Sequence, residues 1–377
     1  MKRKLKAACA VLLAAAIGLA ASGCVTHKSD GRKTVGIAMP AKFLERWNRD
    51  GEYLKQRFEE AGYNVELRFS DNNINQQVND IQVLIADDVD LLIISAIDGG
   101  AMFRTLEDAT IKNIPVICYD RMIPNSEAVK CYVSFDNYSV GQIQAEFIVD
   151  KLGIDRDDKD DSIYNIELVM GDTADTNASV FYNGSMDVLK PYIDSGKIAV
   201  PSGKITFEQT TTPGWETDKA LKNMQNILAS HYSGGKKLDA VLCTSDCLSI
   251  GVIQALMSDY KGGTDPVITG QDGDIAALKA LVDGTLDMTV YKNVRHEADA
   301  TVIVASSILE GKMPDISILS QFPTKCVFDT ETYNNGKEPI ASFLLTAEVI
   351  GRDDLEKLVG TGLYMWDDDH RYLRATS

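Results

Sequence analysis

The sequence predicts an α/β fold with two doubly wound parallel-sheet lobes joined by a multi-strand hinge. The first observation is that short apolar runs, typical of buried strands, alternate with longer segments whose apolar residues recur at helical spacing. The second is that this alternation runs twice along the chain, in two series that meet near residues 131–138. The third is length, because 377 residues exceed what one hydrophobic core usually supports.

In the first series, the runs typical of buried strands lie at 34–39, 65–69, 91–96 and 115–120. The segments between them carry the helical pattern, at 45–61, 73–87 and 100–113. Strands that alternate with helices of this length indicate βαβ units, and therefore a parallel sheet covered by helices on both faces.

The second series repeats the pattern. Its expected strands lie at 165–171, 197–205, 239–245, 266–272 and 287–292. Its expected helices lie at 179–195, 215–231, 247–259 and 274–283. Right-handed crossovers leave only a small set of topologies for each half.

The N-terminus carries the pattern of an export signal. Basic residues within 2–6 precede a small-residue apolar run over 7–21, and two further small residues precede Cys24. The run is shorter than the roughly 20 residues that a membrane-spanning helix needs. A cysteine in this place is similar to a bacterial lipoprotein signal, whose thiol is acylated and becomes the new N-terminus, although Ala21 stands where Leu is usual. An ordinary cleaved signal with an incidental cysteine is the alternative.

We therefore expect a signal peptide over 1–23, lipidation at Cys24 and a tether over 24–33. The protein would then be extracytoplasmic and held at the cell membrane by its lipid anchor. This expected location argues against a cytosolic enzyme.

The composition favours a neutral ligand. The formal charge is −17, and it becomes −21 once the four cations of residues 2–6 are removed with the signal. A surface of this sign repels nucleic acid and anionic lipid headgroups. We therefore expect no nucleic-acid partner.

The chain lacks the motifs of common catalytic and metal sites. No G-x-S-x-G elbow, phosphate-binding glycine loop or H-E-x-x-H sequence occurs. The acidic stretch 155–161 lacks the spacing of a calcium loop, so a solvated loop is the preferred interpretation. We expect no catalytic residues, cofactor or metal, and the cysteines beyond Cys24 to be buried thiols rather than a disulfide framework.

Polar residues follow nearly every expected strand. In doubly wound sheets, ligands bind beyond the carboxyl ends of the strands, so these positions are site candidates. Their side chains offer both hydrogen-bond donors and acceptors, as a polyhydroxylated ligand requires. They are Asp98, Asp120, Arg121, Asp136, Asn137, Asp172, Asp175, Asp246, Gln271, Asp272 and Lys292.

Several segments are similar to one known family. IPVICYDRMI (114–123), YVSFDNYSVGQIQA (132–145), VLKPYIDSGKI (188–198) and TGQDGD (269–274) resemble the bacterial type I periplasmic sugar-binding proteins of ABC importers. Within that family the D-xylose-binding and multiple-monosaccharide-binding proteins are the most similar. The resemblance covers roughly 34–350.

The resemblance implies how the lobes divide the chain. A first lobe of 34–134 plus about 293–322 is expected, and a second of 135–292 plus about 323–352. Residues 353–377 form a tail to which no role is assigned.

The resemblance also implies roles for individual residues. Arg46 and Trp47 would bond to and stack on the sugar, and Trp215 would be the aromatic of the second lobe. Ser245 stands where the xylose binder has a ligand-binding Asn, which puts a preference for xylose in doubt. The other matching ligand contacts are Asp98, Asp175, Asn177, Asp272 and Lys292.

Arg121 and Asp246 are also expected to bind the ligand, because both follow expected strands. Each has an alternative role, because Arg121 could pair with Asp120, and Asp246 could cap the helix that follows it. For Trp47 the alternative is a place in the helix core.

The expected function is that of a monosaccharide-binding lipoprotein without enzymatic activity. It would bind a sugar of the xylose, arabinose, galactose or glucose type between its lobes, as a monomer, and deliver it to an ABC permease in the membrane. The alternative is a sugar-sensing partner of a membrane sensor or chemoreceptor.

Overall fold

The computed structural model describes residues 31–155 and 162–376. Residues from Thr34 to Ser377 form one compact unit, which is described here. The lipidation expected at Cys24 and most of the acidic stretch 155–161 lie outside the described residues.

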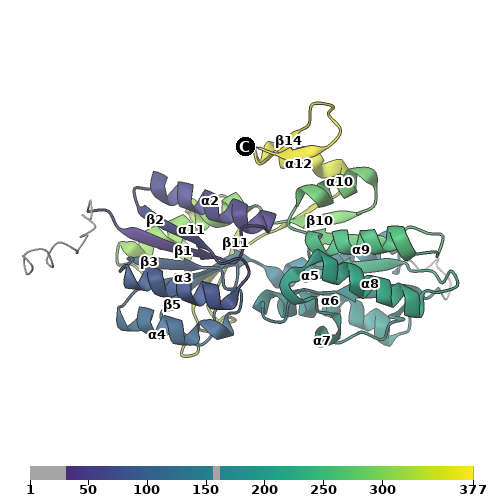
Figure 1. Ribbon diagram of the computed structural model, residues 1–377, viewed down its shortest axis with the longest axis horizontal. Helices are drawn as coiled ribbons and strands as arrows, with labels where there is room; N and C mark the ends of the chain where they lie inside the picture. The colour runs from purple at the N-terminus through teal and green to yellow at the C-terminus, as the bar shows by residue number, and fades with distance from the viewer. Residues whose placement is uncertain (1–30, 156–161, 377) are drawn as a thin grey trace, which may run out of the picture. The chain divides into compact units, whose positions relative to one another are not determined.

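Within the described part of the chain, the first sheet has seven strands in the order β11-β12-β5-β4-β3-β1-β2. All neighbours are parallel except β11, which runs antiparallel to β12. Its strands are β1 (Thr34–Met39), β2 (Asn64–Phe69), β3 (Leu91–Ile94), β4 (Val116–Tyr119), β5 (Val129–Phe135), β11 (Cys326–Asp329) and β12 (Ala341–Leu345). Its helices are α2 (Glu45–Glu60), α3 (Ile74–Ala86), α4 (Phe103–Ile111), α11 (Val294–Leu309) and the short 3-10 turns η1 (Gly100–Met102) and η3 (Ile316–Gln321). Figure 1 shows α2 and α11 on one side of this sheet and α3 and α4 on the other.

The second sheet has six described strands in the order β13-β10-β9-β8-β6-β7, and only β13 is antiparallel to its neighbour. Its strands are β6 (Tyr164–Val169), β7 (Ile198–Ala199), β8 (Ala240–Cys243), β9 (Val267–Gln271), β10 (Met288–Tyr291) and β13 (Glu348–Ile350). Its helical elements are α5 (Asn137–Leu152), α6 (Thr176–Asp194), α7 (Phe207–Thr210), η2 (Pro213–Trp215), α8 (Thr217–His231), α9 (Asp246–Asp259) and α10 (Ile275–Asp283).

The predicted α/β fold with two doubly wound lobes is confirmed. Strands such as β3 and β8 are buried along their whole length, as expected of apolar strands covered by helices on both faces. The chain passes between the two sheets at 135–137, 291–294 and 345–348, which together form the hinge. Each lobe has its own hydrophobic core, and the crossings connect the two lobes.

The expected lobe boundaries are wrong for the segment after 323. Strands β11 and β12 belong to the first sheet, and only β13 lies in the second. The reason is the pairing of β12 with β5, in which Phe343 lies opposite Val133 and is buried in the first core. The expected strand at 197–205 is also shorter, because only Ile198–Ala199 pairs with β6.

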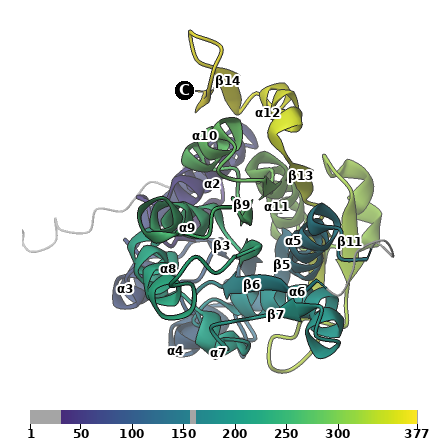
Figure 2. The ribbon, with the colours of Figure 1, turned by 90° about the vertical axis from the view of Figure 1, so that its right-hand side faces the viewer.

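The C-terminal segment, 351–376, is ordered as η4 (Arg352–Asp354), α12 (Leu355–Gly360) and a hairpin of β14 (Tyr364–Trp366) with β15 (Leu373–Ala375). Leu355, Leu358 and Leu373 pack into the core of the second lobe. Figures 1 and 2 both show the segment beside α10, which β15 contacts. Among the described residues, no helix has the length and apolar character needed to cross a membrane.

Candidate ligand-binding site

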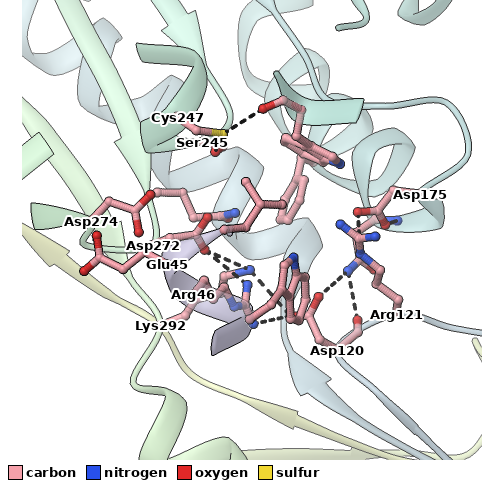
Figure 3. Close-up of a pocket in the computed structure, with 16 residues that line it drawn as sticks. Glu45, Arg46, Asp120, Arg121, Asp175, Ser245, Cys247, Asp272, Asp274 and Lys292 are labelled. Carbon is pink, nitrogen blue, oxygen red and sulfur yellow. Dashed lines mark hydrogen bonds and ion pairs between the residues drawn. The ribbon is translucent and has the colours of Figure 1, made fainter. Parts of the chain in front are cut away.

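A cavity of about 60 Å³ lies between the carboxyl ends of the strands of the two lobes (Figure 3). One bound water needs about 10–15 Å³ of such space, so the cavity admits only a small molecule. Its lining residues are Leu44, Glu45, Arg46, Trp47, Asp120, Arg121, Asp175, Asn177, Phe181, Trp215, Ser245, Cys247, Gln271, Asp272, Asp274 and Lys292.

Helix α2 brings Arg46 and Trp47 to the cavity. Gly51 permits this placement, because a Cβ there would lie 2.7 Å from the ring of Phe69 on β2. The helix therefore packs closely against the first sheet, and Arg46 in its first turn reaches Asp272 of the second lobe.

Arg46 joins carboxylates from both lobes. Its Nη1 donates to Oδ1 of Asp272 at 3.1 Å, and its Nη2 donates to Oδ2 of Asp120 and to Oε2 of Glu297, the latter at 3.1 Å. Lys292 Nζ lies 3.7 Å from Asp120 and 3.6 Å from Asp272. These charges, of which only Asp272 is partly exposed, form a network in which each cation is shared by several acids.

The pKa values of the acids in this network move in opposite directions. Burial would raise the pKa of Asp120, but the positive charges of Arg46, Lys292 and Arg121 outweigh it and hold that pKa below its usual range. Burial, with the nearby charge of Asp120, raises the pKa of Glu297 well above its usual range. Burial also raises the pKa of Asp50, to about 6, despite its 3.5 Å contact with Arg46. Asp120 is therefore an ionised acceptor at neutral pH.

Trp47 supports two arginines. Its side chain is buried, and the guanidinium carbons of Arg46 and Arg121 lie 4.8 and 4.9 Å from its ring centroid. Arg121 also contacts Asp175 of the second lobe, with Nε 2.9 Å from Oδ2. Asn177 donates to the backbone oxygen of Asp120 at 2.8 Å. The strand-end residues of the two lobes thus contact one another directly.

Trp215 forms the wall of the second lobe. It is half-buried and has a φ of +56°, and its ring lies directly on Gly171, where a Cβ would be 2.0 Å from ring atoms. Phe181 lies edge-on to it, with ring centroids 6.5 Å apart. No side chain other than hydrogen could stand at position 171 without displacing Trp215.

Ser245 and Cys247 lie near one another at the start of α9 (Figure 3). The Ser245 hydroxyl lies 2.9 Å from the Cys247 thiol, which donates to the backbone oxygen of Trp215 at 3.2 Å. Burial raises the pKa of Cys247, so the thiol stays protonated and inert.

The loop after β9 carries Asp272 in a strained conformation, with a φ of +103°. Two residues later, burial and the neighbouring charges of Asp272 and Glu45 raise the pKa of Asp274 to about 7. Both carboxylates face α2 across the cleft (Figure 3). Strain of this kind is typical of residues held for a function.

Buried polar atoms without a hydrogen-bond partner remain beside the cavity. Within the described part of the chain, Nε1 of Trp215 and Oε1 of Gln271 have none. Such atoms are rare in folded proteins, and a bound ligand is one explanation for them. No group of three or more His, Cys, Asp or Glu side chains is arranged to hold a metal among the described residues.

Most of the expected site residues meet at this cavity. They are Arg46, Trp47, Arg121, Asp175, Asn177, Trp215, Ser245, Asp272 and Lys292. Asp98 and Asp246 do not line it. The Asp98 carboxylate instead accepts from the backbone N–H groups of Gly100 and Ala101.

Asp246 lies beneath the loop that follows β9. It is fully buried and accepts from the Asp274 backbone N–H at 2.8 Å and from the Thr289 hydroxyl at 3.1 Å. Burial and the charges of Asp274 and Asp272 raise its pKa well above the usual range. Ser245, rather than Asp246, occupies the N-cap of α9.

The cavity also includes residues that were not in the expected ligand-binding set. Asp120 and Gln271 follow strands, so the strand-end rule had named them as candidates. Glu45, Phe181, Cys247 and Asp274 also line the cavity. Glu45 and Asp274 adjoin predicted residues in the sequence, but nothing in the sequence alone shows that they face each other across the cleft.

Comparison with known proteins identifies the class. A family model described as "Periplasmic binding protein domain" matches residues 35–313. The chain therefore belongs to the periplasmic binding protein family, and the expected resemblance to its type I members is confirmed. The family is extracytoplasmic, so the protein works outside the cytoplasm.

Curated relatives match almost the whole chain. The multiple sugar-binding periplasmic receptor ChvE of Rhizobium radiobacter is 38% identical over 363 residues, which cover 96% of this chain and 98% of the relative. The D-xylose-binding periplasmic protein of Escherichia coli is 32% identical, with coverage of 93% and 95%. Both are named as binding proteins or receptors, and the chain belongs to a class of non-enzymatic proteins.

A solved structure agrees with these relatives. The ABC transporter solute binding protein of Clostridium phytofermentans, with bound β-D-glucose, is 39% identical. It aligns with a TM-score of 0.82 over 90% of this chain and 99% of its own.

Proposed function

We propose that this protein binds a monosaccharide between its lobes and delivers it to an ABC importer. The observation that carries the proposal is the composition of the small cavity. Trp215 supplies an aromatic face, and charged donors and acceptors surround it at the strand ends of both lobes. Curated relatives named for sugar binding, and a glucose-bound structure of similar sequence, support the same ligand class.

The chemistry of the walls fits a pyranose ring. The C–H face of the sugar would lie on Trp215, while its hydroxyls would bond to Asp272, Lys292 and Arg46. Hydrogen bonds to charged groups are worth roughly 1.5–3 kcal/mol each, and a sugar that lacks one of these hydroxyls would lose that bond. Selectivity would therefore come from the charged groups and most of the apolar contact from Trp215.

The ligand would also hold the lobes together. Arg46, Arg121 and Asn177 already bond across the cleft, and a sugar that contacts both walls would add to these bonds. A ligand that binds one arrangement of the lobes better than another shifts the population toward it. The permease would then recognise the sugar-loaded arrangement.

Residues 25–377 should be screened by thermal shift against D-glucose, D-galactose, D-xylose and L-arabinose. We expect at least one of them to raise the unfolding temperature, because a ligand that binds only the folded state stabilises it. Mannitol is a matched polyol control without a ring. The absence of a shift with every monosaccharide would refute the proposal.

We further propose that Cys24 is acylated and anchors the protein beside its permease. An apolar run that ends in small residues before this cysteine supports the assignment. Cells grown with an alkyne-labelled palmitate should label the wild-type protein and leave Cys24→Ser unlabelled. Equal labelling of both chains would contradict the anchor.

A further inference from the structure

The C-terminal segment, 351–376, reaches the sugar site through one tyrosine. Tyr364, 1% exposed, stands at the start of β14 and packs against Tyr291 with ring centroids 6.0 Å apart. Its hydroxyl donates to the backbone oxygen of Gly273 at 2.8 Å. Gly273 lies between Asp272 and Asp274, so the C-terminal segment supports the strained loop that carries the binding carboxylate.

The same hydroxyl receives a bond from the first lobe. Arg49 Nη1 donates to Tyr364 at 2.8 Å, and Arg49 Nη2 donates to the backbone oxygen of Asp272 at 3.4 Å. Arg49 is one helical turn from Arg46 on α2, and its Nη2 lies 3.8 Å from Asp274. One arginine of the first lobe thus contacts both the C-terminal segment and the loop of Asp272.

A second arginine of the first lobe also bonds to the segment. Arg295, on α11, donates to the backbone oxygens of Thr361 and Gly362 at 3.1 and 3.4 Å. Helix α11 packs on α2 and on β5 of the first lobe. The C-terminal segment is therefore part of the core of the second lobe while its polar groups bond to the first.

We propose that residues 351–376 act as a clasp on the closed lobes, with Tyr364 and Arg49 as positioning residues for Asp272. The clasp rests on the proposed sugar-binding function, because its effect is to slow the release of that ligand. The bonds that Arg49 makes to Tyr364 and to the loop of Asp272 join the two lobes and would break when the lobes separate, whereas the packing of the segment in the second lobe would persist. The clasp therefore acts on dissociation more than on association.

The test compares two hydroxyls of the same hairpin. Tyr364→Phe keeps the ring and removes the bonds to Gly273 and Arg49. Tyr372→Phe is the matched control, because the Tyr372 hydroxyl donates to Asp283 at 2.8 Å within the second lobe. Arg295→Gln is a second clasp variant that leaves Tyr364 intact.

Stopped-flow tryptophan fluorescence gives the two rate constants for the sugar that the thermal screen identifies. We expect Tyr364→Phe to raise the dissociation rate about tenfold and to change the association rate by less than about twofold, since one of the lost bonds involves a charged group. Arg295→Gln should raise the dissociation rate by a smaller factor. Tyr372→Phe should match wild type.

A measurement without ligand separates failure of the clasp from failure of the proposed function. Small-angle X-ray scattering of the ligand-free chain should give a larger radius of gyration for Tyr364→Phe than for Tyr372→Phe, because the lobes separate more often. If no sugar binds the wild-type protein, the proposed function is wrong, and the radii of gyration alone test the clasp proposal. If a sugar does bind, equal radii together with equal dissociation rates for the two variants would overturn the clasp proposal. If none binds, equal radii alone would overturn it.

Discussion

The two lobes contribute different kinds of wall to one cavity. In the first lobe, Trp47 is buried and holds the guanidinium groups of Arg46 and Arg121 near its ring. In the second, Trp215 is half-buried and its Nε1 has no hydrogen-bond partner among the described residues. Two tryptophans expected to play the same part therefore differ, because one belongs mainly to the fold and the other is free to serve the ligand.

This comparison predicts that Trp47→Ala mainly lowers stability. Removing a buried aromatic side chain costs about 3–5 kcal/mol, and here it would also leave two arginines without their support. Urea unfolding, followed by circular dichroism, measures the loss in the free energy of unfolding. A loss below about 1 kcal/mol would show that Trp47 is not part of the packing.

Asp272 lies where the two walls meet, and Asp272→Ala should abolish measurable sugar binding. The loss is expected to be at least about 100-fold, because charged hydrogen bonds to the sugar are removed and Arg46 and Lys292 lose a shared partner. Isothermal titration calorimetry checks the affinity, and circular dichroism checks that the fold is kept. Asp272→Asn is the control, since Asn tolerates positive φ and keeps one acceptor. An unchanged titration with the alanine variant would contradict the assignment of Asp272 as a sugar-binding residue.

Trp215→Ala should weaken sugar binding by about tenfold while the free energy of unfolding falls less than it does for Trp47→Ala. The reason is that Trp215 is only half-buried and presents its ring to the cavity. The same titration and unfolding measurements, made on both variants, test the contrast directly. If the two variants lose affinity and stability in equal proportion, the distinction between the walls fails.

The smallest expected effect is on the pH dependence of stability. Because the folded-state pKa of Asp274 is raised to about 7, the folded chain binds a proton that the unfolded chain has released above about pH 4. The free energy of unfolding should therefore fall as pH rises from about 4 to 7. Asp274→Asn, which stays neutral, should reduce that fall by on the order of 1 kcal/mol in urea titrations at pH 5 and pH 8. An identical fall in both chains would show that Asp274 does not titrate in this range.

Much of the fold was predictable because buried parallel strands such as β3 and β8 leave continuous apolar runs in the sequence. The lobe to which β12 belongs was not predictable in this way. β12 belongs to the first sheet because it pairs with β5, which lies about 200 residues earlier in the chain. The local sequence of a strand does not specify which distant strand it pairs with.

The candidate site shows the same limit. The strand-end rule selected Asp272 and Lys292, whose positions follow from the sheet alone. Asp98 met the rule as well, but its carboxylate accepts a hydrogen bond from the nearby backbone N–H of Gly100 and does not line the cavity. Glu45 and Asp274 were missed because their facing positions depend on how the lobes meet. Contacts across a hinge are set by tertiary arrangement rather than by local pattern.

Gly171 has a consequence for how such a site could change over time. Because the Trp215 ring lies where a Cβ would stand, even Gly171→Ala would displace this ring, which lines the cavity. The volume offered to a ligand could therefore be altered by a residue that does not line the cavity. Substitution at position 171 could therefore change ligand selectivity during evolution while every charged group that lines the cavity stays the same.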